Sequence, residues 1–172
     1  MQVNNDKALR EVELFFKKVE GALEKTSKAA LSEMGEALVK QTPVYFEHEP
    51  TAGNARANWV VSAGNPDTTY DASAADITGI DTIRRLRDEI RAINIQDGSM
   101  VYISNTGPAG KLEALEFGKY PNPPKRGSYN KKTREFEIRS QGGYSLQAPA
   151  GIVGVTAMQW SDIVEEINLK QK

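Results

Sequence analysis

The chain has 172 residues, of which 39% are hydrophobic and 26% charged, and its formal net charge at pH 7 is -1. This length suffices for one domain, 1–172, and the charge balance excludes a protein built as a whole for nucleic acid or anionic membranes. The absence of cysteine excludes disulfides, thiolate metal sites and cysteine nucleophiles. No secretory signal and no run of about 18 apolar residues occurs, so we expect a protein made in the cytoplasm without a membrane span.

The first predicted element is a long helix over about residues 6–41, ended by Pro43. At about 1.5 Å per residue it would be on the order of 50 Å long. Either part of its apolar face packs on another subunit, or it is an ordinary core helix, broken near Gly21 or Gly35. The apolar residues that recur at steps of three and four are Leu9, Val12, Phe16, Val19, Leu23, Ala30, Met34 and Ala37.

Shorter elements follow over about residues 55–118. The helical spacing of Ile80, Ile83, Leu86, Ile90 and Ile93 predicts a helix after Asp81, which would lie in its N-cap region. A short helix is predicted from Pro108 to Phe117. Runs rich in β-branched and aromatic residues, or alternating polar with apolar, predict strands over residues 58–63, 99–105 and 133–139. The expected class is α+β, with a small, mainly antiparallel sheet and flanking helices.

The end of the chain is predicted to be a helix over about residues 149–168. Apolar residues keep helical spacing there, and Pro149 suits a first helical turn. A strand over 151–157 is the alternative. A phosphate-binding loop is excluded, because no basic residue or Ser/Thr follows the glycines as that motif requires.

Residues that could carry catalysis are few. His48 is the only histidine and lies between two glutamates, which is typical of a solvated loop. Glu113 and Glu116 lie three apart on a predicted helix and so share a face, which favours a surface or subunit contact over acid–base chemistry. We therefore expect no enzyme, no cofactor and no metal site.

An exposed loop or arm is predicted over about residues 120–139, which is rich in proline, glycine and lysine. Between Lys125 and Arg139, six basic residues against two acidic ones give a net charge of +4. The arm could bind nucleic acid, with interleaved tyrosines as stacking surfaces, or be a solvated hairpin that docks on an acidic neighbour. Its basic residues are Lys125, Arg126, Lys131, Lys132, Arg134 and Arg139.

The segment 51–64 predicts a tight turn at Gly53 followed by a strand. Trp59 supplies a large apolar side chain at the start of that strand. Arg56 would be free to pair with a carboxylate. The segment is therefore a turn with a core tryptophan or a clamp between subunits.

Three groups of residues, in this order, resemble the tail-completion and neck (head-tail joining) proteins of tailed bacteriophages, the HK97 gp10-like family. The first is Thr42-Pro43-Val44 followed by Gly53-Asn54-Ala55-Arg56-Ala57-Asn58-Trp59. The second is a strand ending in Asn105, then Pro108, then Leu115-Glu116-Phe117-Gly118. The third is Gln147-Ala148-Pro149-Ala150-Gly151-Ile152-Val153 before the last helix.

The resemblance implies a structural protein of the virion tail or neck that assembles as a ring, commonly a homohexamer, and lets DNA pass. Its partners would be copies of itself and neighbouring neck proteins, such as head-closure or adaptor, tail terminator or tail-tube proteins, with transient contact to DNA and none to membrane. A tail terminator, or a DNA-binding module using the 125–139 arm, is the alternative. The expected subunit or partner contacts are Arg56, Trp59, Glu116, Lys125, Arg126, Lys131, Lys132 and Arg134.

Overall fold

The computed structural model describes residues 5–44, 50–95, 100–117, 128–130, 134–137, 140–141, 144–145, 148 and 151–170. The helices are α1 (Asn5–Gln41), α2 (Asn54–Ala57), α3 (Ile80–Ala92), α4 (Ala109–Phe117), α5 (Val153–Met158) and α6 (Trp160–Lys170). The strands are β1 (Trp59–Ala63), β2 (Val101–Asn105), β3 (Ser128–Asn130), β4 (Glu135–Glu137), β5 (Ser140–Gln141) and β6 (Tyr144–Ser145). The predicted α+β class, with a long first helix and a C-terminal helix, is confirmed.

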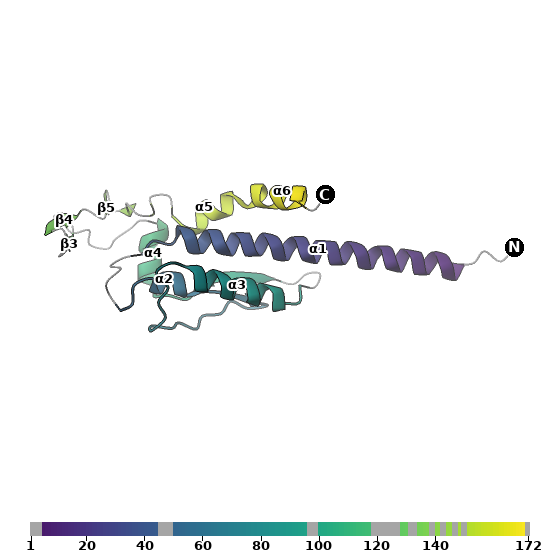
Figure 1. The fold of residues 1–172 in the computed structure, drawn as a ribbon, viewed down its shortest axis with the longest axis horizontal. Coiled ribbons are helices and arrows are strands. Elements are labelled where there is room, and N and C mark those ends of the chain that lie inside the picture. Colours follow the sequence, from purple (N-terminus) through teal and green to yellow (C-terminus); the bar gives the residue numbers. More distant parts are fainter. Residues whose placement is uncertain are drawn as a thin grey trace.

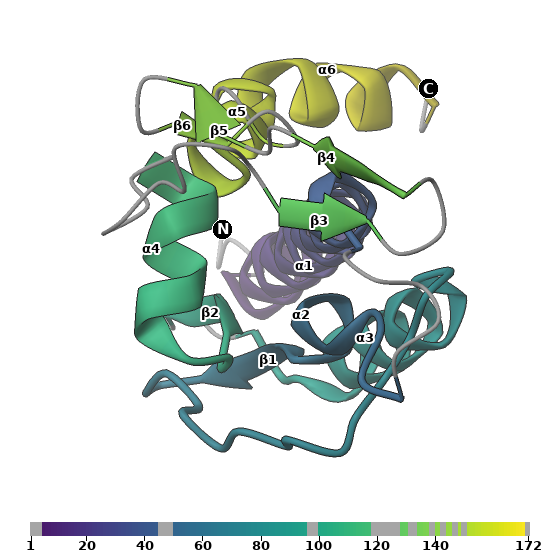
Figure 2. The same ribbon diagram turned by 90° about the vertical axis from the view of Figure 1, so that its left-hand side faces the viewer.

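The long helix α1 is the axis of the molecule. Figure 1 shows α3 and the β1–β2 pair along one side of its second half, and α5 and α6 along the other. The end-on view in Figure 2 shows the same three layers, with α1 in the middle. The strands β3 and β4 lie at the end of the molecule opposite the N-terminus.

Helix α1 is continuous, so the predicted break near Gly21 or Gly35 does not occur. Gly35 lies where α1 meets α3, and a Cβ built there would be 3.5 Å from the Leu86 side chain. The helix ends as predicted before Pro43. There the Thr42 amide donates to Leu38 O, and the Thr42 hydroxyl donates to the same carbonyl at 2.7 Å.

The pair β1–β2 is antiparallel, and Trp59 lies opposite Asn105 in its register. The pairs β3–β4 and β5–β6 are also antiparallel but much shorter. The side chains that fill the space between α1, α3, α4 and β1 form the core, and burying them stabilises the three-layer arrangement. These core residues are Leu38, Val39, Trp59, Leu86, Leu115, Ala148 and Ile152.

The C-terminal segment differs from its predicted form in where its helix begins and in being divided into two helices. The helix predicted from about residue 149 begins only at Val153, because Gly151 has a φ of +80°, a left-handed conformation that interrupts a helix. It is also divided at Gln159, whose amide bonds to Thr156 O, three residues back, before α6 begins. The alternative strand over 151–157 is likewise wrong.

The predicted arm contains regular structure where a loop was expected. Residues 128–130 form β3, and the strand predicted over 133–139 is described only as β4, over 135–137. Arg134 adopts a left-handed φ of 59° immediately before β4, a conformation that a non-glycine residue rarely takes and that the sequence did not indicate.

Candidate assembly interface

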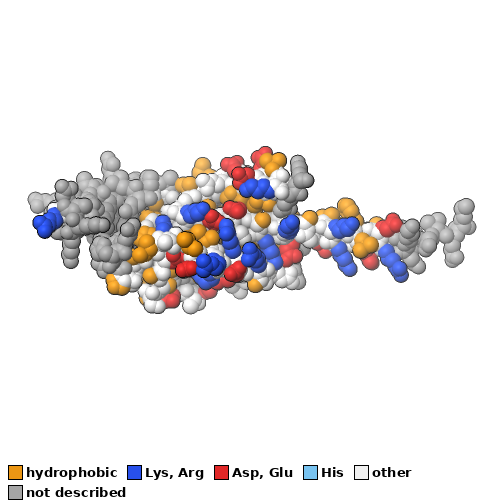
Figure 3. Space-filling view, viewed as in Figure 1, with side chains coloured by type: hydrophobic (Ala, Val, Ile, Leu, Met, Phe, Trp, Pro, Cys, Tyr) orange, Lys and Arg blue, Asp and Glu red, His pale blue; other side chains and the backbone are white. Residues whose placement is uncertain are grey.

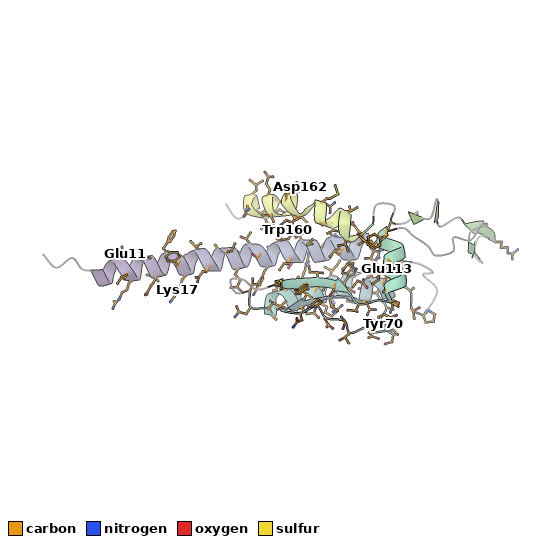
Figure 4. The ribbon with its side chains drawn as sticks, turned by 180° about the vertical axis from the view of Figure 1, so that it is seen from behind. Glu11, Lys17, Tyr70, Glu113, Trp160 and Asp162 are labelled. Atoms are coloured by element: carbon orange, nitrogen blue, oxygen red, sulfur yellow. The ribbon has the colours of Figure 1, made fainter. Side chains whose placement is uncertain are left out.

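The N-terminal half of α1 projects beyond the rest of the molecule. Every residue from 9 to 23 is exposed, whereas half-buried and buried residues become frequent from residue 24 onward. Figure 1 shows this part of α1, which we call the extension (residues 9–23), with no other element beside it. In Figure 4, Glu11 and Lys17 lie on the extension, far from Glu113 on α4.

The extension carries large apolar side chains in water. Leu9 and Leu14 are each 59% exposed and Leu23 is 66% exposed. Apolar patches of this density on soluble proteins mark surfaces that bind another molecule. The apolar residues concerned are Leu9, Val12, Leu14, Phe15, Phe16, Val19 and Leu23. In Figure 3, apolar and basic side chains alternate along the visible side of the extension.

Arg56 is used inside the chain. It is half-buried at the end of α2, and its guanidinium donates from Nε to Thr42 O at 2.7 Å and from Nη1 to Ile77 O. The expected carboxylate pairing is therefore replaced by two backbone carbonyls. Arg56 fastens the end of α1 to the loop before α3.

Trp59 is a core residue, as one of the two sequence interpretations predicted. Its side chain is 3% exposed, and its Nε1 donates to the Thr42 hydroxyl at 2.8 Å. A side chain so buried has almost nothing to present to another subunit, so its place among the predicted contacts is corrected. Trp59 thus binds the hydroxyl of Thr42, and Arg56 binds its backbone carbonyl.

Glu116 caps the first turn of α5. Its carboxylate accepts hydrogen bonds from the backbone N–H groups of Ile152, Val153 and Gly154, at 2.8, 2.7 and 2.8 Å. Burial alone would raise the pKa of Glu116, but these three hydrogen bonds together hold its pKa below the ordinary value. Glu116 therefore acts as an internal fastener between α4 and α5.

Gly151 makes this cap possible. Its φ is +80°, and a Cβ built on it would lie 2.6 Å from the backbone oxygen of Glu116. Only glycine fits such a position without displacing α4. The described members of the second and third residue groups that carry the resemblance thus meet at Glu116 and Gly151.

Asp76 is a further structural residue. Its carboxylate accepts hydrogen bonds from the amide of Gly79, which immediately precedes α3, from the amide of Thr82 in the first turn of α3, and from the Thr82 and Thr78 hydroxyls. Burial alone would raise the pKa of Asp76, but these hydrogen bonds lower it below the usual value. Asp76 is not among the site residues predicted from the sequence. The spacing Asp-x-Thr-Gly before an apolar-periodic run is the signal of a helix start that could have identified it.

Most of the basic arm lies outside the described residues, as do Lys125, Arg126, Lys131 and Lys132 among the predicted contacts, and also His48. Arg134 is exposed at the turn before β4. The structure therefore places Arg134 at the end of the molecule opposite the extension, and leaves the other arm residues as predictions.

Groups for chemistry are sparse in the described part of the chain. Glu113 is exposed, whereas the Glu116 carboxylate is occupied by backbone amides, so the two do not form a catalytic pair. Within the described ranges, no group of three or more His, Cys, Asp or Glu residues could hold a metal, and no helix is long and apolar enough to cross a membrane.

One open pocket of about 300 Å³ lies between α1, α3 and α6. Its cations already have partners, because Arg87 pairs with Glu36, Arg91 with Asp88, and Lys170 with Glu166. The lining residues are Ala29, Ser32, Glu33, Arg87, Arg91, Ile167 and Lys170. This pocket is a shallow, charge-balanced junction of three helices.

Compared with protein-family models, with curated proteins and with solved structures, the chain matches none.

Proposed function

We propose that this chain is a structural protein of a tailed-bacteriophage virion, a tail-completion or neck subunit that forms a ring between the tail and the head connector. The observation that carries the proposal is the extension, a stretch of helix whose apolar residues are exposed in the single chain. A protein that works alone would gain nothing from this exposed apolar surface, whereas a subunit buries it on assembly.

The residue groups that resemble the family support the proposal from a second side. Within the first group, Thr42 contacts Arg56 and Trp59, and Glu116 of the second group contacts Gly151 of the third group, 35 positions further along, and its neighbours. These contacts join the end of α1 to α2 and β1, and join α4 to the start of α5. We therefore interpret the shared residues as those that maintain a ring-forming fold, while subunit contacts lie elsewhere on the surface.

The ring would have a through-channel for DNA and would contact neck or tail proteins above and below. Six copies are expected from the resemblance. A closed ring uses head-to-tail contacts that repeat by rotation, so each subunit needs two different surfaces. Such a protein needs neither cofactor nor membrane and would reside in the virion.

The test is electron microscopy and sedimentation of the purified full-length chain, alone and mixed with head-closure and tail-tube proteins of the same phage. The proposal predicts rings with an open centre that bind the head-closure protein. Rings that bind only tube protein would identify a tail terminator instead. Particles without a central opening, or a chain that binds neither neighbour, would contradict the proposal.

The exposed Arg134 keeps the DNA-binding module as a second candidate. Filter binding of duplex DNA across a series of salt concentrations separates the two. Binding by basic side chains to phosphates weakens steeply as salt rises. A steep slope that disappears when Arg134 and the neighbouring lysines are replaced by glutamine would favour the DNA-binding module.

A further inference from the structure

We propose that the extension of α1 (residues 9–23) packs in parallel against the extensions of other copies of this chain, with the acidic edge of one helix beside the basic edge of the next. This inference rests on the proposed ring, and it names both the surface and its occupant.

The large apolar side chains of the extension, apart from Leu14, gather on one face. At about 100° per residue, Leu9, Phe16 and Leu23 lie in one row along the helix, and Val12 and Val19 lie in the next row. Apolar residues with this sequence spacing are typical of helices that pack side by side. Phe15, with Ala22, adds a third row. The face is then roughly 140° wide, which exceeds the narrow seam of a two-helix pair. A helix with so wide a face can contact a neighbour on each side.

The face has edges of opposite charge. Glu13 and Glu20 border the row of Leu9 and Phe16, on one side of the apolar face. The row of Glu11, Lys18 and Lys25 borders the row of Phe15 on the other side, and its two lysines against one glutamate give it a net positive charge. Among the described residues, Glu13, Glu20, Lys18 and Lys25 have no ion-pair partner within the chain.

These edges select the arrangement. In parallel packing, the Glu13 and Glu20 edge of one helix faces the Lys18 and Lys25 edge of the next, and long lysine side chains can span the gap. In antiparallel packing, each edge faces its own copy, so glutamates oppose glutamates. Charge complementarity therefore favours parallel helices related by rotation, which is the symmetry of a ring. A second copy of the chain thus fits the face in both apolarity and charge.

The first experiment compares leucines on two faces of the same helix. Leu9→Gln and Leu23→Gln remove apolar surface from the proposed contact without adding charge. Leu14→Gln is the matched control, because Leu14 is as exposed as Leu9 but points away from the apolar face. Sedimentation velocity across a concentration series measures the concentration at which half the chains are assembled, and circular dichroism monitors the helix content.

We expect Leu9→Gln and Leu23→Gln each to raise that concentration about tenfold or more, and Leu14→Gln to change it less than about twofold. If the wild-type ring forms and all three variants form it equally well, this inference is overturned while the proposed function stands. If the chain remains a monomer at every concentration, both are overturned. If the extensions assemble into particles without a central opening, the inference stands and the proposed function fails.

The second experiment tests the direction of packing. One double variant, Glu13→Lys with Glu20→Lys, makes both edges basic. The other, Lys18→Glu with Lys25→Glu, makes both edges acidic. Parallel packing predicts that each variant alone assembles poorly and that an equimolar mixture assembles like the wild type, by alternating the two. Antiparallel packing predicts that each variant alone assembles as the wild type does, and that result would overturn the proposed arrangement.

Discussion

At the scale of single residues, the structure depends on polar side chains that satisfy backbone groups at the ends of helices. Glu116 accepts three amides at the start of α5, Asp76 accepts two at the start of α3, and Thr42 binds the last turn of α1. Such amides and carbonyls lack partners within a helix and cost free energy when they are buried unpaired. These three residues therefore contribute to stability through the elements that they join.

Replacing Glu116 by glutamine should lower the free energy of unfolding by about 1–3 kcal/mol, because the amide nitrogen of glutamine cannot accept a hydrogen bond from an N–H group. Chemical denaturation monitored by fluorescence measures the change. Glu113→Gln is the control on the same helix, since Glu113 is exposed. Equal effects of both substitutions would contradict the assigned role of Glu116.

The same carboxylates predict how stability depends on pH. The pKa values of Glu116 and Asp76 are lower in the folded chain than their ordinary values of 4.5 and 3.8. A carboxylate whose pKa is lower in the folded than in the unfolded chain stabilises the fold fully at pH values above its unfolded pKa. This stabilisation is lost as the pH falls through the folded pKa. We expect the free energy of unfolding to decline below about pH 5, and to decline less steeply in Glu116→Gln. An identical acid limb in wild type and variant would refute this assignment.

Gly151 provides a separate test of the same contact. Gly151→Ala should lower the free energy of unfolding by about 1–3 kcal/mol, because the added Cβ would be 2.6 Å from Glu116 O at a left-handed φ. Gly64→Ala is the matched control, since Gly64 has a φ of +82° but nothing within 4 Å of the added atom. The difference between the two, measured by thermal unfolding, isolates the clash with α4.

At the scale of elements, α1 has two halves with different surroundings. The second half packs between α3 and α6, where Glu36 pairs with Arg87 of α3. The first half has no such neighbours, so its helical conformation in the single chain depends on the helix propensity of its residues and on pairs of side chains along the helix. Glycine in this half therefore weakens the helix without a packing reason.

Gly21→Ala should increase the stability of the extension by about 0.5–1 kcal/mol, because alanine favours helix and the added Cβ meets nothing within 4 Å. Amide hydrogen exchange of residues 9–23 should slow in this variant. Gly35→Ala serves as the comparison, because its Cβ would touch Leu86 at 3.5 Å and its effect would include that contact. Unchanged exchange in Gly21→Ala would show that the extension is already protected by assembly.

The sequence predicted the elements better than their ends. Periodicity identified α1, α3, α4, β1 and β2, because each is amphipathic or bounded by proline, glycine or asparagine. It placed the start of the last helix too early, since the left-handed backbone at Gly151 follows from the contact with Glu116, which is 35 positions away. Contacts over such sequence distances leave no local pattern.

The assembly interface itself stays a prediction, but the structure gives several of the predicted contact residues roles within one chain. The length of α1 and its apolar stripe indicated a possible subunit contact, and the exposure of residues 9–23 is consistent with it. Arg56, Trp59 and Glu116 were instead found to bind Thr42 and the start of α5 within one chain. Their types suit interfaces and interiors equally, so spacing alone could not distinguish the two.

At the scale of the whole molecule, assembly and stability are linked. If the extensions bury their apolar faces on each other, assembly stabilises the folded state, and the melting temperature rises with protein concentration. We expect this dependence in calorimetry of the wild type and a weaker one in Leu23→Gln, while Leu14→Gln resembles the wild type. A melting temperature that is independent of concentration in the wild type would contradict self-assembly through this surface.

The unbroken course of α1 also has a mechanical consequence. A single helix runs from the projecting end into the middle layer. A force applied to the extension would therefore act directly on the part of α1 that is packed in the core. Because α1 is unbroken, the helix cannot bend at a hinge, and the force would be transmitted to α3, α6 and the β1–β2 pair. Displacement of the extension would therefore also displace Thr42 at the other end of α1, where Arg56 and Trp59 bind it.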